Sequence, residues 1–68
     1  MKNYLIFGIF LFIYKKKKTT ALEIAEKFEI SRRTVYRYID ELCKAGIPLR
    51  TQQGINGGII IDKNYKFE

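Results

Sequence analysis

The spacing of apolar side chains predicts three helices, of which the first spans about residues 2–16. Its inward face has the i, i+3, i+4, i+7 spacing of a core-facing helix and consists of Ile6, Ile9, Phe10 and Ile13. Its other faces are also apolar and carry Leu5, Phe7, Leu11 and Phe12. A helix that is apolar nearly all round needs cover on more than one side. We expect this cover from a second copy of the chain or from a missing neighbouring domain.

The second helix is predicted over about residues 20–28 and begins at a capping motif. Thr20 and Glu23 have the spacing of a capping box. In that motif the Thr hydroxyl accepts from the amide of the third helical residue, while the Glu side chain reaches back to the capping residue. The inward stripe consists of Ile24, Ala25 and Phe28.

The third helix is predicted over about residues 31–45, with Ser31 as its N-cap and Gly46 just past its end. Its inward positions are Val35, Ile39 and Leu42. The gap of about three residues between Phe28 and Ser31 is the turn length of a helix-turn-helix.

A hairpin is predicted over about residues 48–62. Leu49–Gln52 and Ile59–Ile61 can pair as antiparallel strands, and Asn56-Gly57 is a tight-turn signal. The fold class is therefore mainly α with a small β-hairpin: a single winged helix-turn-helix domain over residues 1–68. The hairpin either closes the core as a β-cap or contacts a nucleic-acid phosphate or the minor groove through Arg50, Gln52, Gln53 or Asn56.

Positive charge is concentrated in two segments of this chain, which has a net charge of +6. Residues 2–18 carry five lysines and no acid, and residues 31–39 carry three arginines and no acid. Residues 19–30, between them, hold three glutamates against one lysine. This asymmetry favours nucleic acid or an anionic membrane surface as the partner.

The cations of the third helix lie where a recognition helix enters the major groove of DNA. With Val35, Ile39 and Leu42 buried, the arginines and Tyr36 project the other way, near the helix N-terminus. Arg can pair with guanine, and the helix N-terminus favours a phosphate. The candidate DNA-binding residues are Ser31, Arg32, Arg33, Thr34, Tyr36 and Arg37 on the helix, with Arg50 and Asn56 on the hairpin. The alternative for each arginine is a solvated helix face.

The composition argues against an enzyme. With no His, the chain lacks the base of a Ser–His or Cys–His pair, and with one cysteine it can form no internal disulfide. The glutamates of the second helix recur every third residue, as on a solvated face. We therefore expect no catalytic centre, cofactor or metal, and a reducing cytoplasm as the compartment.

The apolar run from Tyr4 to Tyr14 is about eleven residues, well short of the roughly 20 that span a bilayer. Four lysines follow it, where a secretory signal would have small residues. We expect no membrane partner, although a surface anchor formed by residues 4–18 remains an alternative.

The chain resembles a known family through the string T-A-x-E-I-A-E-K-F-x-I-S-x-R-T-V-Y-R-x-I-D-x-L-x-x-A-G-I-P followed by a glycine-rich turn. This string is similar to the biotin-repressor-like (type 11) winged helix at the N-terminus of bacterial transcription regulators, including WYL-domain and DeoR-like regulators. The chain departs from the family pattern at Tyr38, where many relatives have Asp. It also departs at Ile55-Asn56, where the relatives' wing often carries Arg.

The resemblance implies sequence-specific binding to double-stranded DNA by a cytoplasmic, nucleoid-associated regulator, with residues 31–45 as the recognition helix. Ser31, Arg33, Thr34 and Arg37 correspond to the family's DNA-facing positions. Relatives carry a C-terminal effector domain, so the chain is expected to be an excised domain or a small stand-alone regulator. We expect a homodimer through the first helix or contact with such an effector domain. The runner-up function is a protein-interaction module that uses the same apolar helix.

Overall fold

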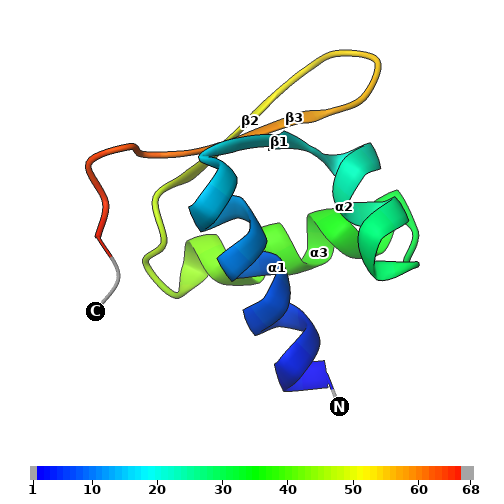
Figure 1. Ribbon diagram of the computed structural model, residues 1–68, viewed down its shortest axis with the longest axis horizontal. Coiled ribbons are helices and arrows are strands. Elements are labelled where there is room, and N and C mark those ends of the chain that lie inside the picture. The colour runs from blue at the N-terminus through cyan, green and yellow to red at the C-terminus, as the bar shows by residue number, and fades with distance from the viewer. Residues whose placement is uncertain (1, 67–68) are drawn as a thin grey trace.

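The computed structural model describes the backbone of residues 2–66 and the side chains from Tyr4 onward. The elements are α1 (Lys2–Lys16), β1 (Lys18–Thr20), α2 (Ala21–Phe28), α3 (Arg32–Lys44), β2 (Leu49–Gln52) and β3 (Gly58–Ile61). Figure 1 shows the strands along one side of the molecule, with α1 and α3 on the other. The predicted fold class, mainly helical with a small antiparallel wing, is confirmed.

The sheet contains a third strand that the sequence pattern did not predict. Its strand order is β1-β3-β2 with all neighbours antiparallel, so β3 is central. Lys17, with φ 69°, reverses the chain after α1, and its carbonyl accepts from the Ile61 N–H at 3.0 Å. Because β1 has only three residues, it is too short to show the alternation by which a strand is predicted.

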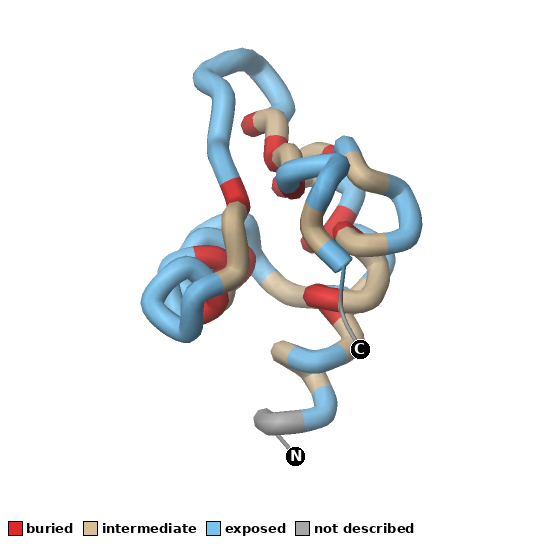
Figure 2. The backbone as a smooth tube through the Cα atoms, turned by 90° about the vertical axis from the view of Figure 1, so that its left-hand side faces the viewer, coloured by how far each residue is buried: buried red, intermediate tan, exposed pale blue. Residues whose placement is uncertain are grey.

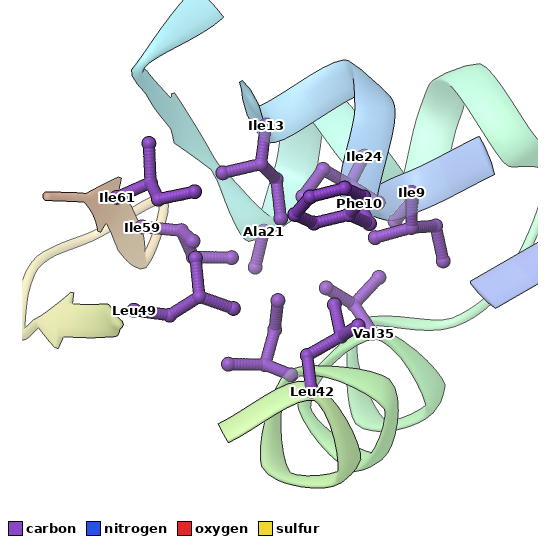
Figure 3. Close-up of a cluster of buried hydrophobic side chains, with 12 residues drawn as sticks. Ile9, Phe10, Ile13, Ala21, Ile24, Val35, Leu42, Leu49, Ile59 and Ile61 are labelled. Carbon is purple, nitrogen blue, oxygen red and sulfur yellow. The ribbon is translucent and has the colours of Figure 1, made fainter. Parts of the chain in front are cut away.

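The core lies where the inner face of the sheet meets the three helices (Figure 3). It comprises Ile9, Phe10, Ile13, Ala21, Ile24, Ala25, Val35, Ile39, Leu42, Leu49, Ile59 and Ile61. The predicted inward stripes of α1, α2 and α3 are therefore confirmed, although Ile6 and Phe28 are only half-buried at its edge.

The outer faces of α1 are partly covered from within the chain. The ring of Phe12 meets that of Phe28 edge-on, with centroids 6.1 Å apart. Leu5 and Leu11 are half-buried against the core. Tyr4 and Phe7, however, remain 77% and 49% exposed. The exposed apolar surface of α1 is thus smaller than the sequence suggests, and it is confined to the N-terminal half of the helix.

The end of α3 has the predicted glycine cap. Gly46 has φ 98°, its N–H donates to Cys43, and the Ile47 N–H donates to Leu42, each at 3.0 Å. These two bonds form a Schellman motif, which satisfies terminal carbonyls of the helix and turns the chain toward β2.

The prediction of a tight Asn56-Gly57 turn was wrong. Gln52 pairs with Gly58, so the connection between β2 and β3 has five residues, 53–57. Only Gly57 takes a positive φ there (71°), whereas the two-residue turn needs one at Asn56 as well. The physical reason is that the carbonyls of Asn56 and Gly57 accept from the N–H groups of Leu22 and Ala21, which draws the chain toward α2.

The start of α2 joins the predicted cap to a small polar network. The Glu23 N–H donates to the Thr20 hydroxyl at 3.0 Å, as predicted. The Glu23 carboxylate accepts from the hydroxyl of buried Thr19 and from Lys16 at 2.8 Å. These two hydrogen bonds, the Lys16 one first, lower the pKa of Glu23, and the Thr20 backbone N–H makes a smaller contribution. The network therefore connects the end of α1 to the start of α2.

We expect Glu23→Gln to lower the thermal midpoint at pH 7 and to have progressively less effect as the pH falls toward about 3. A carboxyl whose pKa is lowered in the folded state stabilises the fold above its unfolded pKa, about 4.3, and loses that contribution as it is protonated. Thermal melts followed by circular dichroism measure the effect. Glu26→Gln, an exposed position on the same helix, is the control. If the thermal midpoint of Glu23→Gln stays below that of the wild type by the same amount down to about pH 3, this account is contradicted.

Candidate nucleic-acid interface

The turn between α2 and α3 closes without glycine. Glu29 takes the left-handed conformation at φ 57°, and the Ile30 N–H donates to the Ala25 carbonyl at 3.0 Å. Ala25 itself is buried in the core. The short turn fixes the direction in which α3 leaves α2, so the outer face of α3 has a defined orientation.

The N-terminus of α3 is capped and turned to solvent. The Ser31 hydroxyl accepts from the Thr34 N–H at 3.1 Å and lies 3.0 Å from the Thr34 hydroxyl. The first bond within the helix runs from the Val35 N–H to the Ser31 carbonyl, so the N–H groups of Arg32 and Arg33 precede it. Such groups at the positive end of a helix are suited to a phosphate oxygen.

Three arginines and a tyrosine occupy the outer face of this helix end. Arg32, Arg33, Tyr36 and Arg37 are all exposed, whereas Val35, Ile39 and Leu42 are buried on the opposite face. In the part of the chain that the structure describes, the ion pairs are Lys16–Glu23 and Lys44–Asp40. The guanidinium groups of Arg33 and Arg37 are thus not neutralised by a carboxylate, and they add positive charge to the helix N-terminus.

The wing loop, residues 53–57, is attached to both helices of the helix-turn-helix. One guanidinium nitrogen of Arg32, Nη1, donates to the Ile55 carbonyl at 3.2 Å. The next two carbonyls, of Asn56 and Gly57, accept from Leu22 and Ala21 at 3.3 and 2.7 Å. Three consecutive loop carbonyls are therefore bound at the N-terminal ends of α3 and α2, and they position the wing beside the arginines.

A groove of about 430 Å³ separates α3 from the wing, lined by Tyr36, Thr51, Gln52, Gln53, Gly54 and Gly57. Two observations favour glycine at position 57 in this groove. Its φ of 71° favours glycine, and a Cβ there would overlap the Tyr36 hydroxyl, which would have to move. The tyrosine hydroxyl therefore rests on the wing backbone, and the groove is bordered by hydroxyl and amide groups that can donate to phosphate or base edges.

The structure brings most of the predicted site residues together, but Arg50 lies apart from them. Ser31, Arg32, Arg33, Tyr36 and Arg37 form one exposed surface; Thr34 is half-buried within it, and Asn56 lies in the wing loop. Along β2, Leu49 is buried and Arg50 is exposed, so Arg50 lies on the outer face of the sheet. There it faces Ile60 and, beyond it, Lys18.

That outer sheet face contains a second hollow, of about 590 Å³. Its lining includes the cations Lys17, Lys18, Arg50 and Lys63, with Asp62 as the acid among them. The predicted contribution of Arg50 to DNA binding thus belongs to a different surface from that of the α3 arginines. Thr51 and Gly57 line the groove beside Tyr36 without having been predicted. Glycine in a turn and threonine in a strand both have common structural explanations, so neither residue carries a distinct functional signal in the sequence.

None of the helices in residues 2–66 has the length and apolar character needed to cross a membrane.

Comparison with known proteins assigns the family. A family model described as "HTH domain" (type 11) matches residues 7–60. The match begins within α1, covers α2 and α3 and reaches into β3, and it agrees with the helix-turn-helix geometry and the basic outer face of α3. The chain therefore belongs to this family of helix-turn-helix DNA-binding domains, and the predicted resemblance to the type 11 domain is confirmed.

Over all 68 residues the chain is 43% identical to the "Uncharacterized HTH-type transcriptional regulator YobV" of Bacillus subtilis (strain 168). It spans 22% of the length of that relative. No solved structure matches the chain significantly.

Proposed function

We propose that the chain binds double-stranded DNA sequence-specifically as the DNA-binding domain of a bacterial transcription regulator in the cytoplasm. In this proposal α3 enters the major groove with its N-terminal end, and the wing lies along the neighbouring phosphate backbone. The family, and a relative named as a transcriptional regulator, support the proposal. The domain contributes binding rather than catalysis.

The observation that carries the proposal is the arrangement of charge on α3. Arg33 and Arg37 lie four residues apart, exposed and without a carboxylate partner in the described chain. The acids of the helix, Asp40 and Glu41, follow them toward its C-terminal half. A recognition helix needs this order, because its N-terminal residues contact base edges and phosphates.

The proposal is tested by fluorescence-anisotropy titration of random-sequence duplex DNA at several salt concentrations. If about 4–6 phosphates are neutralised, log K falls with log salt at a slope of about −4 to −5. Affinity then drops about 250- to 1,000-fold between about 50 and 200 mM salt. Selection from a random duplex library should enrich a defined sequence. Absence of binding at about 50 mM salt, or binding that salt does not weaken, would contradict duplex recognition.

We propose in addition that α1 forms an interface, either with a second copy of the chain or with a C-terminal effector domain. The exposed rings of Tyr4 and Phe7 favour this role, and Phe7 also packs against Phe10, with centroids 6.3 Å apart. Sedimentation equilibrium of the chain alone distinguishes the two partners. A dimer supports self-association, whereas a monomer at all the concentrations used for DNA binding excludes it.

A further inference from the structure

The outer face of the sheet is a second basic surface, separate from that of α3. Its hollow of about 590 Å³ is lined by the exposed cations Lys18, Arg50 and Lys63 and by the half-buried Ile60. Figure 2 shows the exposed part of β2 continuing into the exposed wing loop. Because the inner face of the sheet meets the helices, this outer face lies on the opposite side of the sheet from α3. The duplex contacts proposed for α3 therefore do not use it.

One row of side chains crosses this face in the order cation, apolar group, cation. Lys18 of β1 and Arg50 of β2 both pair with Ile60 of the central strand, so the three residues lie side by side. Neighbouring strands are about 4.8 Å apart, which places the backbones of Lys18 and Arg50 roughly 10 Å from each other. Pro48 and Leu49 add apolar lining to the hollow. The surface thus combines two separated charges with an apolar floor.

The cations of this row are not neutralised by a carboxylate among the described residues. The ion pairs in that part of the chain involve Lys16 and Lys44. Asp62, the acid of the hollow, accepts from the Asn64 N–H at 3.0 Å, which holds its carboxylate in the turn after β3. Like charges gathered without a counter-charge repel one another and do not stabilise the folded chain. Their arrangement instead suits an anionic partner that also carries an apolar group.

We propose that the outer face of the sheet binds an acidic amphipathic helix of a separate protein. A helix rises about 1.5 Å per residue, so two acids seven positions apart are separated by about 10.5 Å. An apolar residue four positions after the first acid lies between them on the same face. A helix laid across the strands would place its acids at Lys18 and Arg50 and its apolar side chain on Ile60.

The apolar floor favours a protein helix over a second DNA duplex. A phosphate backbone would match the two cations, but it offers little apolar surface for Ile60. An apolar side chain set between two acids removes the exposed part of Ile60 from water, which is favourable. Protein interfaces combine an apolar centre with a polar rim in this way.

The chain does not present the matching pattern itself. In its sequence no two acids lie seven residues apart, so a second copy lacks such a helix. The described chain also leaves this face after Lys63, because Tyr65 packs edge-on against Phe10 and Tyr14 on the helical side. The occupant is therefore a separate protein.

A labelled synthetic helical peptide tests the proposal. It carries two glutamates seven positions apart and a leucine four positions after the first, on an alanine–glutamine background. The control peptide has the same composition, with the leucine on the opposite face. Fluorescence anisotropy at about 50 mM salt, where ionic contacts are weakly screened, measures both affinities. The wild type is expected to bind the matched peptide about 5- to 10-fold more tightly, because only this peptide buries its leucine on Ile60.

Two variants separate the charges from the apolar floor. Lys18→Ala/Arg50→Ala is expected to bind the matched peptide about 5- to 10-fold more weakly, through the loss of two ion pairs. Ile60→Ala should reduce the ratio between the two peptides to below about twofold. The matched control is Arg33→Ala/Arg37→Ala, which removes the same charge from α3 and should keep the peptide affinity within about twofold of the wild type. Circular dichroism confirms that each variant is folded.

Four results would overturn docking on this face. They are a Kd above about 1 mM for the matched peptide, equal affinity for the two peptides, and equal losses in the two double variants. The fourth is displacement of the peptide from Arg33→Ala/Arg37→Ala by random duplex DNA as efficiently as by unlabelled peptide, since the face would then bind DNA. Each of these results leaves duplex recognition by α3 intact.

Discussion

Replacing Arg33 and Arg37 together by Ala is expected to lower the affinity for duplex DNA about 100-fold at 50 mM salt. Both guanidinium groups are exposed on the outer face of α3 and lack a carboxylate partner among the described residues. Each contact to a phosphate or a guanine contributes about 1–3 kcal/mol. Loss of two phosphate contacts would also reduce the magnitude of the salt slope by about 2. Anisotropy titrations at about 50 and 200 mM salt measure both quantities.

The control removes the same charge elsewhere. Lys63→Ala/Lys66→Ala also lowers the net charge by two, but at exposed positions after β3 rather than on α3. If the arginine variant weakens binding no more than this lysine variant, DNA binding depends on overall charge and the face of α3 is not the interface. The arginines are exposed and outside the core, so both variants should remain folded.

Ile59→Ala is expected to destabilise the domain by about 2–5 kcal/mol. Ile59 is fully buried in β3, the central strand, where its side chain contributes to the core shared by the sheet and the helices. A chain of 68 residues buries a small core, and the total stability of such domains lies near the low end of about 5–15 kcal/mol. A loss at the upper end of this range would remove nearly all of that stability. Urea denaturation followed by circular dichroism measures the difference.

The neighbouring isoleucine provides the comparison. Ile60 belongs to the same strand and faces the outside of the sheet, where it is half-buried. We expect Ile60→Ala to cost about 1 kcal/mol or less. Equal losses in the two variants would mean that Ile59 is not in the core and that the register of β3 is wrong.

Local signals were sufficient to predict the helices. Ser31 caps α3, Thr20 caps α2, and Gly46 ends α3, each with the hydrogen bonds that its residue type implies. The inward residues of α3 could be predicted because a helix this polar has only one apolar stripe. The N-terminal apolar helix was harder, since its pattern does not show which of its faces the rest of the chain covers.

Features that depend on distant parts of the chain could not be predicted. β1 forms because Lys18–Thr20 pairs with residues 58–60 of β3, about forty residues later. The wing loop departs from a tight turn because its carbonyls bind α2. Glu29 occupies a left-handed position that sequence rules assign to glycine, and its N–H donates to the Ala25 carbonyl at the end of α2.

Some features of the candidate site also follow from local sequence, whereas others depend on distant parts of the chain. The arginine face follows from the helix period alone, so all its members could be named from the sequence. The place of Arg50 depends on the face of β2 that meets the core, and the groove beside Tyr36 depends on the path of the wing loop. The Arg32–Ile55 bond joins residues 23 positions apart and has no local sequence signal.

The attachment of the wing loop also has a consequence for how the chain folds. The first amides of α2, at Ala21 and Leu22, find their acceptors in residues 56 and 57. During synthesis these residues leave the ribosome more than thirty positions after Ala21 and Leu22, so α2 first emerges with those two amides bound only to water. Contacts between such distant positions carry a high loop-closure cost and form late. The DNA-binding unit therefore reaches its final form only when the glycine-rich segment has been translated. A nascent chain halted before residue 57 cannot yet make the bond between Ala21 and Gly57.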